Sequence, residues 1–82
     1  MNKKRRKLPY PRNQDILEAI IEVLYNPLIT PDAFPLEVKE KLKSKGFFTG
    51  LVTTKRIWQV YEKNVRQGTI PDVLGVVKEE NE

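Results

Sequence analysis

The sequence contains no cysteine and no histidine. Without cysteine, disulfide bonds and thiolate metal sites are excluded, and a reducing compartment is compatible with the composition. Zinc sites, cysteine nucleophiles, Ser-His-Asp triads and histidine general bases are excluded as well. The 11 acids are scattered and form no paired arrangement that suggests a carboxylate site. We therefore predict that the protein is not an enzyme, and that it uses no metal, no other cofactor and no small-molecule substrate.

Long apolar runs are also missing. None approaches the roughly 20 residues that a transmembrane helix needs, so we expect no membrane association. The basic N-terminus continues into Pro-Tyr-Pro and not into an apolar segment, so we expect no secretory signal. These absences predict one small soluble domain in a chain of 82 residues. Its expected location is cytoplasmic and nucleoid-associated, or nuclear in a eukaryote.

Positive charge is present and is gathered in two blocks. The net charge is +4, but residues 13–36 and 69–82 are net acidic. Residues 37–68 form one basic block, and residues 1–12 form the other, without any acid. The bases of the N-terminal block are Lys3, Lys4, Arg5, Arg6, Lys7 and Arg12. Such asymmetry is expected of a protein that binds a polyanion, although solubility alone would tolerate it.

Residues 1–12 predict a flexible basic arm, because they lack apolar periodicity and contain Pro9 and Pro11. Adjacent like charges repel one another unless a partner offsets them, which favours phosphate contact by counterion release. The alternatives are a solvated tail and a nuclear import signal, which would look similar. At the other end, residues 79–82 are expected to form a frayed acidic tail.

A first amphipathic helix is expected from a cap at Asn13 to about Tyr25, followed by a proline that stops it. Its outer face is acidic and is expected to point away from any polyanion. Ile20, Ile21 and Leu24 could form a dimer seam. A place in the core is the better interpretation, because so short a domain needs its large apolar residues for itself.

A second helix is expected over about residues 35–44, with its apolar residues spaced i, i+4 and i+8 from Phe34. Gly46 can end it. The loop that follows contains Phe47 and Phe48, which we expect to fill the core. Beside basic residues, this aromatic pair could instead stack on the bases of a single strand.

The strongest helical pattern covers residues 53–68. Thr53 or Thr54 can cap its start, and Gly68 can end it. Trp58 falls on the apolar side of the helical wheel, and we expect it to be largely buried against the first helix. The opposite side can reach phosphates and base edges, although exposed bases are often only solvated. The candidate contacts here are Thr53, Thr54, Lys55, Arg56, Gln59, Lys63 and Arg66.

The expected fold is mainly α. Residues 13–78 would form a three-helix domain, and the β-branched residues of 69–78 favour an extended segment or a short C-terminal strand. The order of an acidic helix, a lysine-rich helix, a glycine turn and a basic-faced helix resembles the helix-turn-helix and winged-helix superfamily of DNA-binding domains. The likeness covers roughly residues 14–77 and is clearest over residues 37–47 and 53–61.

This resemblance implies a small non-enzymatic protein that binds double-stranded DNA, of the kind found among transcription regulators. The third helix would enter the major groove with its early residues nearest the base edges, and the basic arm would follow the backbone. A homodimer is compatible with it, since a single small reading head often needs a second copy. The alternatives are an adaptor domain that binds an acidic protein surface, and an RNA-binding protein.

Overall fold

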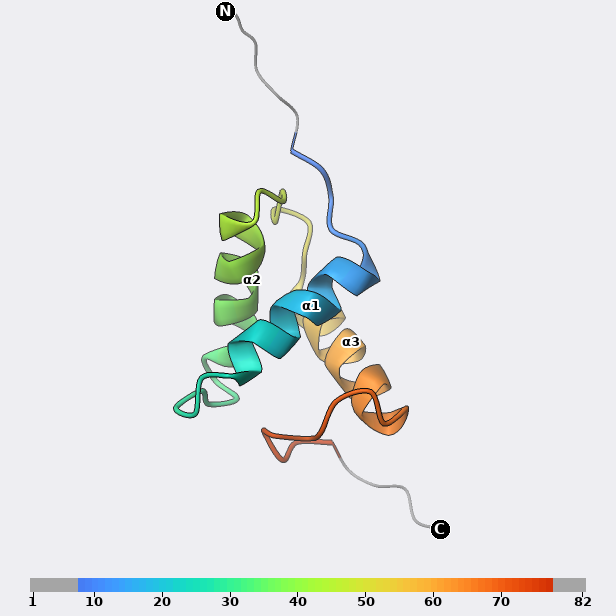
Figure 1. The fold of residues 1–82 in the computed structure, drawn as a ribbon. Coiled ribbons are helices and arrows are strands. Elements are labelled where there is room, and N and C mark those ends of the chain that lie inside the picture. Colours follow the sequence, from blue (N-terminus) through green and yellow to red (C-terminus); the bar gives the residue numbers. More distant parts are fainter. Residues whose placement is uncertain (1–7, 78–82) are drawn as a thin grey trace, which may run out of the picture.

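The computed structural model describes residues 8–77, and this part of the chain contains three helices and no strand. Helix α1, Asn13–Leu24, crosses the molecule and contacts both α2, Phe34–Ser44, and α3, Thr54–Arg66 (Figure 1). The prediction of a mainly α fold is confirmed, whereas residues 69–77 do not form the short strand that their composition favoured. None of the helices in the described residues has the length and apolar character needed to cross a membrane.

Helix α1 begins one residue earlier than the sequence predicted. Arg12, not Asn13, occupies the N-cap position, in an extended conformation. The backbone N–H of Arg12 donates to the Asp15 carboxylate at 2.8 Å, which also places a negative charge at the positive end of the helix. Asn13 is the first helical residue, so its side chain is available to another element. The buried residues of α1 are Ile16, Leu17, Ala19, Ile20 and Val23.

Helix α2 is preceded by a turn over residues 31–33. The Thr30 carbonyl accepts a hydrogen bond from the N–H of Phe34 at 3.0 Å, and α2 starts at that residue. Pro35 lies in the first turn, where an N–H has no helical partner to lose. Gly46, with φ of 95°, follows the last turn. The inward residues Phe34, Val38 and Leu42 are fully buried, as their spacing predicted.

Helix α3 starts at the predicted cap. The Thr53 hydroxyl accepts a hydrogen bond from the N–H of Arg56 at 3.0 Å. Trp58 packs against the core with part of its surface exposed. Its ring centroid lies 4.9 Å from that of Phe34, at the start of α2, whereas the expected contact was with the first helix. Val60, two residues later, is among the buried residues of α3.

The segment after α3 folds back over that helix without regular structure. Ile70 completes the core with 6% of its surface exposed. The Tyr61 hydroxyl donates to the Asp72 carboxylate at 2.6 Å and accepts from the N–H of Leu74 at 3.1 Å. The N–H of Val77 also donates to the Asp72 carboxylate, at 3.0 Å. These N–H groups are therefore used by two side chains and not by a neighbouring strand, which is why the β-branched content produces no sheet here.

The loop between α2 and α3 only partly follows the prediction for its aromatic pair. Phe47 packs against the edge of the core, and Val52 is buried. Phe48 points outward with 38% of its surface exposed, and Leu51 is 64% exposed. One ring of the pair therefore fills the core, and the other lies on the surface.

Candidate nucleic-acid interface

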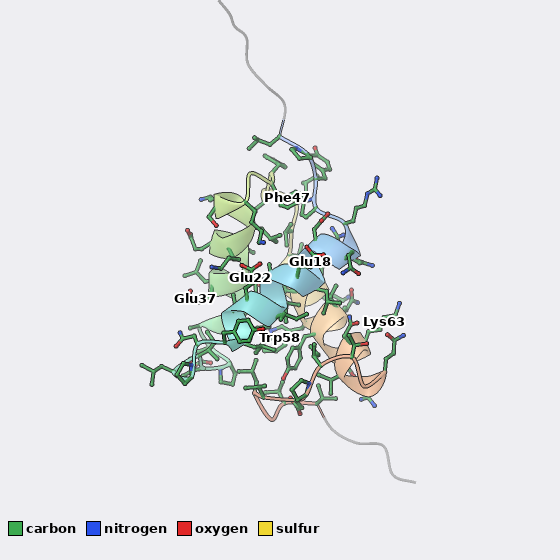
Figure 2. The ribbon with its side chains drawn as sticks, in the orientation of Figure 1. Glu18, Glu22, Glu37, Phe47, Trp58 and Lys63 are labelled. Atoms are coloured by element: carbon green, nitrogen blue, oxygen red, sulfur yellow. The ribbon has the colours of Figure 1, made fainter. Side chains whose placement is uncertain are left out.

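Helix α3 presents a polar stripe on the side that faces away from the core. Lys55, Gln59 and Lys63 follow one another at i, i+4 and i+8, so their side chains lie along one line of the helix surface. All three are exposed. The line spans roughly 12 Å at 1.5 Å per residue. Figure 2 shows Lys63 on the outer side of α3, with Glu37 on the far side of the molecule. We call these three residues the α3 stripe.

Two threonines lie at the start of helix α3, before the first residue of the α3 stripe. Thr53 and Thr54 are both exposed. The Thr53 hydroxyl is engaged as the helix cap, so its oxygen already accepts one hydrogen bond. Thr54, the first helical residue, presents its hydroxyl beside the first turn, where the N–H groups and the helix dipole attract an anion.

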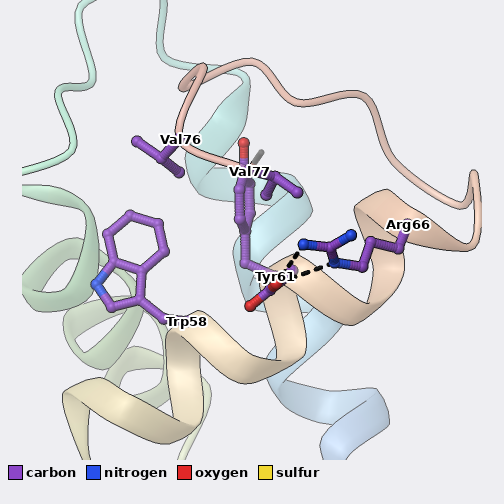
Figure 3. A pocket seen from close by; sticks show the side chains of 6 residues that line it. Trp58, Tyr61, Arg66, Val76 and Val77 are labelled. Carbon is purple, nitrogen blue, oxygen red and sulfur yellow. Dashed lines mark hydrogen bonds and ion pairs between the residues drawn. The ribbon is translucent and has the colours of Figure 1, made fainter. Parts of the chain in front are cut away.

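Arg66 borders the α3 stripe, but its charge is already partly offset. Its Nη2 and Nε atoms lie 2.8 and 2.9 Å from the same carboxylate oxygen of Glu62, one turn earlier (Figure 3). Both side chains are on the surface, where such a pair is weak and is sensitive to salt. A phosphate contact by Arg66 would therefore have to compete with Glu62.

Arg56 is turned away from the α3 stripe and toward the N-terminal segment. Its Nη2 donates to the carbonyl of Pro11 and to the side-chain oxygen of Asn13, both at 3.1 Å. Its Nε donates to the same Asn13 oxygen at 3.3 Å. The sequence placed Arg56 among the residues that face the major groove. In the structure its guanidinium instead joins α3 to the start of α1 and to the residue before Arg12.

Residues 9–12 contact the folded domain, although the sequence assigned them to a flexible arm. The N–H of Phe48 donates to the Pro9 carbonyl at 2.9 Å, and the Tyr10 ring stacks on that of Phe48. Pro11 is buried, whereas the Arg12 side chain is exposed. The contacts of the domain thus begin before residue 13. The predicted contacts Lys3, Lys4, Arg5, Arg6 and Lys7, and the acidic tail 79–82, lie outside the described residues.

A polar groove of about 210 Å³ separates the first turns of α1 from the second half of α3. Its polar rim holds the amides of Asn13, Gln14, Asn64 and Gln67 and the ammonium group of Lys63. The described residues that line it include no acid. The groove therefore extends the α3 stripe toward α1 with further groups that can donate hydrogen bonds to phosphate oxygens.

The acids of α1 are directed toward α2. Glu22 pairs with Lys45, whose Nζ lies 2.6 Å away, and more loosely with Lys41 at 3.9 Å. The hydrogen bond from Lys45 lowers the pKa of the Glu22 carboxyl. Glu18 and Asp15 lie one and two turns earlier on the same side of α1. Lys41 and Lys45 thus offset the charge of Glu22 on the acidic side of α1, and that side does not face the α3 stripe.

A second hollow, of about 500 Å³, lies on the other border of α3 (Figure 3). Trp58, Tyr61 and Val77 are among the residues that line it, with the pair of Glu62 and Arg66 at its edge. Burial, together with the hydrogen bond to a carboxylate, raises the pKa of Tyr61 to about 12, so its hydroxyl stays protonated near neutral pH. Trp58, Val76 and Val77 give this hollow an apolar contact surface.

The structure therefore brings together part of the predicted set and adds residues that the sequence did not single out. Lys55, Gln59 and Lys63 lie along one side of α3, whereas the Arg56 guanidinium is hydrogen-bonded to Pro11 and Asn13. The added residues are Tyr10, Asn13, Gln14 and Gln67. Gln67 could have been found, since it follows Lys63 at i+4. The contacts of Asn13 and Tyr10 join positions about 40 residues apart, and a sequence pattern carries no sign of them.

Comparisons with known proteins leave the chain without a family. No family model matches it. Searches of curated proteins and of solved structures likewise found no significant similarity. The arrangement of the described residues is therefore the basis on which a function can be assigned.

Proposed function

We propose that the protein binds double-stranded DNA through the α3 stripe and the basic N-terminal arm. The observation that carries this proposal is the contact of Arg56 with Pro11 and Asn13. It holds Pro11 beside the first turns of α3, and the basic residues 3–7 precede Pro11 by only a few positions in the chain. Two basic elements joined in this way support binding to one continuous polyanion.

Within this proposal, the residues of α3 have different tasks. Gln59, in the middle of the stripe, is placed to read a base edge, since an amide can pair with adenine in the major groove. Lys55 and Lys63 contact phosphates on either side of it and supply affinity without sequence preference. The groove between α1 and α3 binds the next phosphate along the strand. Arg56 positions the arm and reads no base.

We further propose that α2 and α3 act as a helix-turn-helix pair, as in small transcription regulators. Three features support this: α1 packs on both other helices, Gly46 ends α2, and a threonine cap opens α3. The connection of residues 45–53 is longer than the compact turn of the strict motif. A two-stranded wing is not formed by residues 69–77, so this proposal involves the helices and the arm alone.

A second candidate function is a protein-interaction adaptor. It is favoured by Tyr25, Leu28 and Leu36, around the connection of α1 to α2, which are 80%, 82% and 60% exposed. Large apolar side chains that remain exposed in a folded domain can mark a contact with another protein. An RNA-binding protein would use the same basic groups as a DNA-binding one.

The deciding experiment compares the intact chain with a variant that lacks residues 2–7. Both keep the described contacts of residues 8–12. Binding to mixed-sequence duplex DNA is measured across a salt series, with duplex RNA of the same sequence as the comparison. We expect both proteins to bind DNA, and the salt slope of the shortened variant to be smaller by roughly 0.9 for each phosphate that the arm neutralises in the intact chain. Binding by the intact chain alone would remove the folded domain from the interface and favour the adaptor. Tighter binding to RNA would favour an RNA-binding function.

A further inference from the structure

Two aromatic rings lie stacked on the surface where the N-terminal segment meets the loop before α3. The ring centroids of Tyr10 and Phe48 are 5.3 Å apart, and the ring planes differ by 26°. Tyr10 is 62% exposed and Phe48 is 38% exposed. An aromatic pair usually hides most of its surface in a core. Here one ring supports the other, and Tyr10 remains largely open to solvent.

The stack is held in place by contacts that do not bury it. The N–H of Phe48 donates to the Pro9 carbonyl at 2.9 Å, which ties the two segments together beside the rings. The Phe48 ring lies so close to Gly50 that a Cβ there would be 2.5 Å from the ring tip. On the other side of Tyr10, the Pro11 carbonyl accepts from Arg56 at 3.1 Å. The stack is thus held by backbone hydrogen bonds and by the close approach of Phe48 to Gly50, on two segments far apart in the sequence.

The surroundings of the stack are basic. Arg12, two residues after Tyr10, is exposed, and residues 1–12 contain no acid. The run of five bases ends at Lys7, three residues before Tyr10. A chain of three residues spans at most about 11 Å, so the backbone of Lys7 is tethered within about that distance of the backbone of Tyr10. An aromatic surface beside cationic side chains is the combination that binds a nucleic-acid strand, because bases stack on the rings while the cations neutralise the phosphates.

We propose that Tyr10 and Phe48 form a stacking platform for an unpaired nucleobase. The protein then binds duplex DNA with a single-stranded extension more tightly than the same duplex with blunt ends. This inference rests on the proposed DNA binding and adds the kind of DNA that is preferred. It also identifies Tyr10 as the residue that contacts the base and Phe48 as the ring that supports it.

The test measures the affinity of the intact chain for a blunt duplex and for the same duplex with a short thymine overhang. A 2-aminopurine at the first unpaired position reports stacking through quenching of its fluorescence. We expect the overhang to raise affinity by about tenfold, which is within the range for one stacked base, and the 2-aminopurine signal to fall on binding.

Four variants separate stacking from other contacts. Tyr10→Ala should remove the preference for the overhang, measured as the ratio of the two affinities of that same variant. Tyr10→Trp should keep the preference. Tyr10→Leu is the matched control, because it is apolar but has no ring to stack. Gly50→Ala should weaken the preference too, since its Cβ displaces the Phe48 ring. Circular dichroism of each variant confirms that the helices are retained.

Failure of this inference can be distinguished from failure of the proposed function. Equal binding to both DNAs by the intact chain, or a preference that survives Tyr10→Ala, would overturn the platform while DNA binding stands. A preference retained by Tyr10→Leu would show an apolar contact and would overturn base stacking. Binding to the duplex with the overhang but not to the blunt duplex would support the platform and contradict the proposed duplex binding. Absence of binding to either DNA would overturn both.

Discussion

Arg56 and Gln59 lie one turn apart on α3, but their contacts give them different expected effects on DNA binding. Arg56 is engaged with Pro11 and Asn13, whereas Gln59 lies in the centre of the α3 stripe. Gln59→Ala should reduce discrimination between a preferred site and mixed sequence by about 1 to 3 kcal/mol if the amide reads a base. Arg56→Ala should weaken binding to both DNAs equally, because it releases the N-terminal segment. Competition binding with the two DNAs measures both effects, and an equal loss by Gln59→Ala would contradict base reading.

Tyr61 gives a prediction on stability and its dependence on pH. Its hydroxyl donates to Asp72 and accepts from the N–H of Leu74, so Tyr61→Phe should lower the free energy of unfolding by about 1 to 3 kcal/mol at neutral pH. The folded-state pKa of Tyr61 is raised to about 12 from 10.0. Its contribution is therefore complete below pH 10 and is lost as the pH rises toward 12.

Urea unfolding at pH 7 and through the alkaline range measures this effect. The wild type should lose more stability than Tyr61→Phe between pH 10 and 12, since lysine ionisation is common to both proteins. Equal alkaline losses would show that Tyr61 ionises as an exposed phenol does.

The stability contributed by Asp72 depends on pH in the opposite direction, because it is lost at acid pH. Burial acts to raise its pKa, but hydrogen bonds from Tyr61 and from backbone N–H groups outweigh burial and lower the pKa. Its contribution is therefore lost as the pH falls below about 4.

At the scale of elements, residues 69–77, which follow α3, contribute to the core although they form neither a helix nor a strand. Ile70 is 6% exposed within the core, whereas Val73, three residues later, is 53% exposed. Ile70→Ala should lower the free energy of unfolding by about 2 to 4 kcal/mol, because it leaves a cavity between helices. Val73→Ala, the control, should change it by less than about 0.5 kcal/mol. Thermal and urea unfolding compare the two, and equal small effects would mean that the segment does not contribute to the core.

The three helices could be predicted because each has a local signal. Apolar residues recur with the helical period, Thr53 caps α3, and Gly46 and Gly68 mark two C-terminal ends. The predicted start of α1 was one residue too late, because the Asp15 carboxylate accepts a hydrogen bond from the Arg12 N–H and makes Arg12 the cap in place of Asn13. Residues 69–77 do not form the short strand that their composition favoured. N–H groups of this segment donate to the Tyr61 hydroxyl and to the Asp72 carboxylate, and composition within the segment cannot show the contact with Tyr61.

The candidate site was less predictable than the helices. Exposure of the α3 stripe followed from the helical wheel, and Lys55, Gln59 and Lys63 were placed correctly on it. Arg56 occupies the neighbouring wheel position but meets a carbonyl 45 residues earlier in the chain. A wheel places a side chain on a face of its own helix and does not reveal which other segment that face meets. The outward position of Phe48 depends on Tyr10 in the same way.

Across the whole molecule, the lysines divide into two groups that are expected to differ in DNA binding. Lys41 of α2 and Lys45, the residue that follows α2, are paired with Glu22, and Lys43 lies on α2. Lys63 lies on the outer side of α3. Lys63→Ala should lower affinity for all DNA sequences and reduce the salt slope by about 1. Lys43→Ala removes the same charge and should leave the slope unchanged if α2 faces away from the DNA. Equal effects would indicate diffuse attraction to net charge and would contradict a defined interface.

The attachment of the N-terminal segment at Pro11 has a consequence for the kinetics of association. The lysine and arginine residues of positions 3–7 lie only a few residues before the Pro11 carbonyl, which is anchored by Arg56. Once one of them binds a phosphate, the α3 stripe experiences a high effective concentration of DNA. The arm would then set how often DNA is captured, and the helix would set how long it is retained. Removal of the Arg56 hydrogen bonds would lengthen the tether between the arm and α3 and lower the effective concentration of DNA. The arm would then more often dissociate from the DNA before α3 binds.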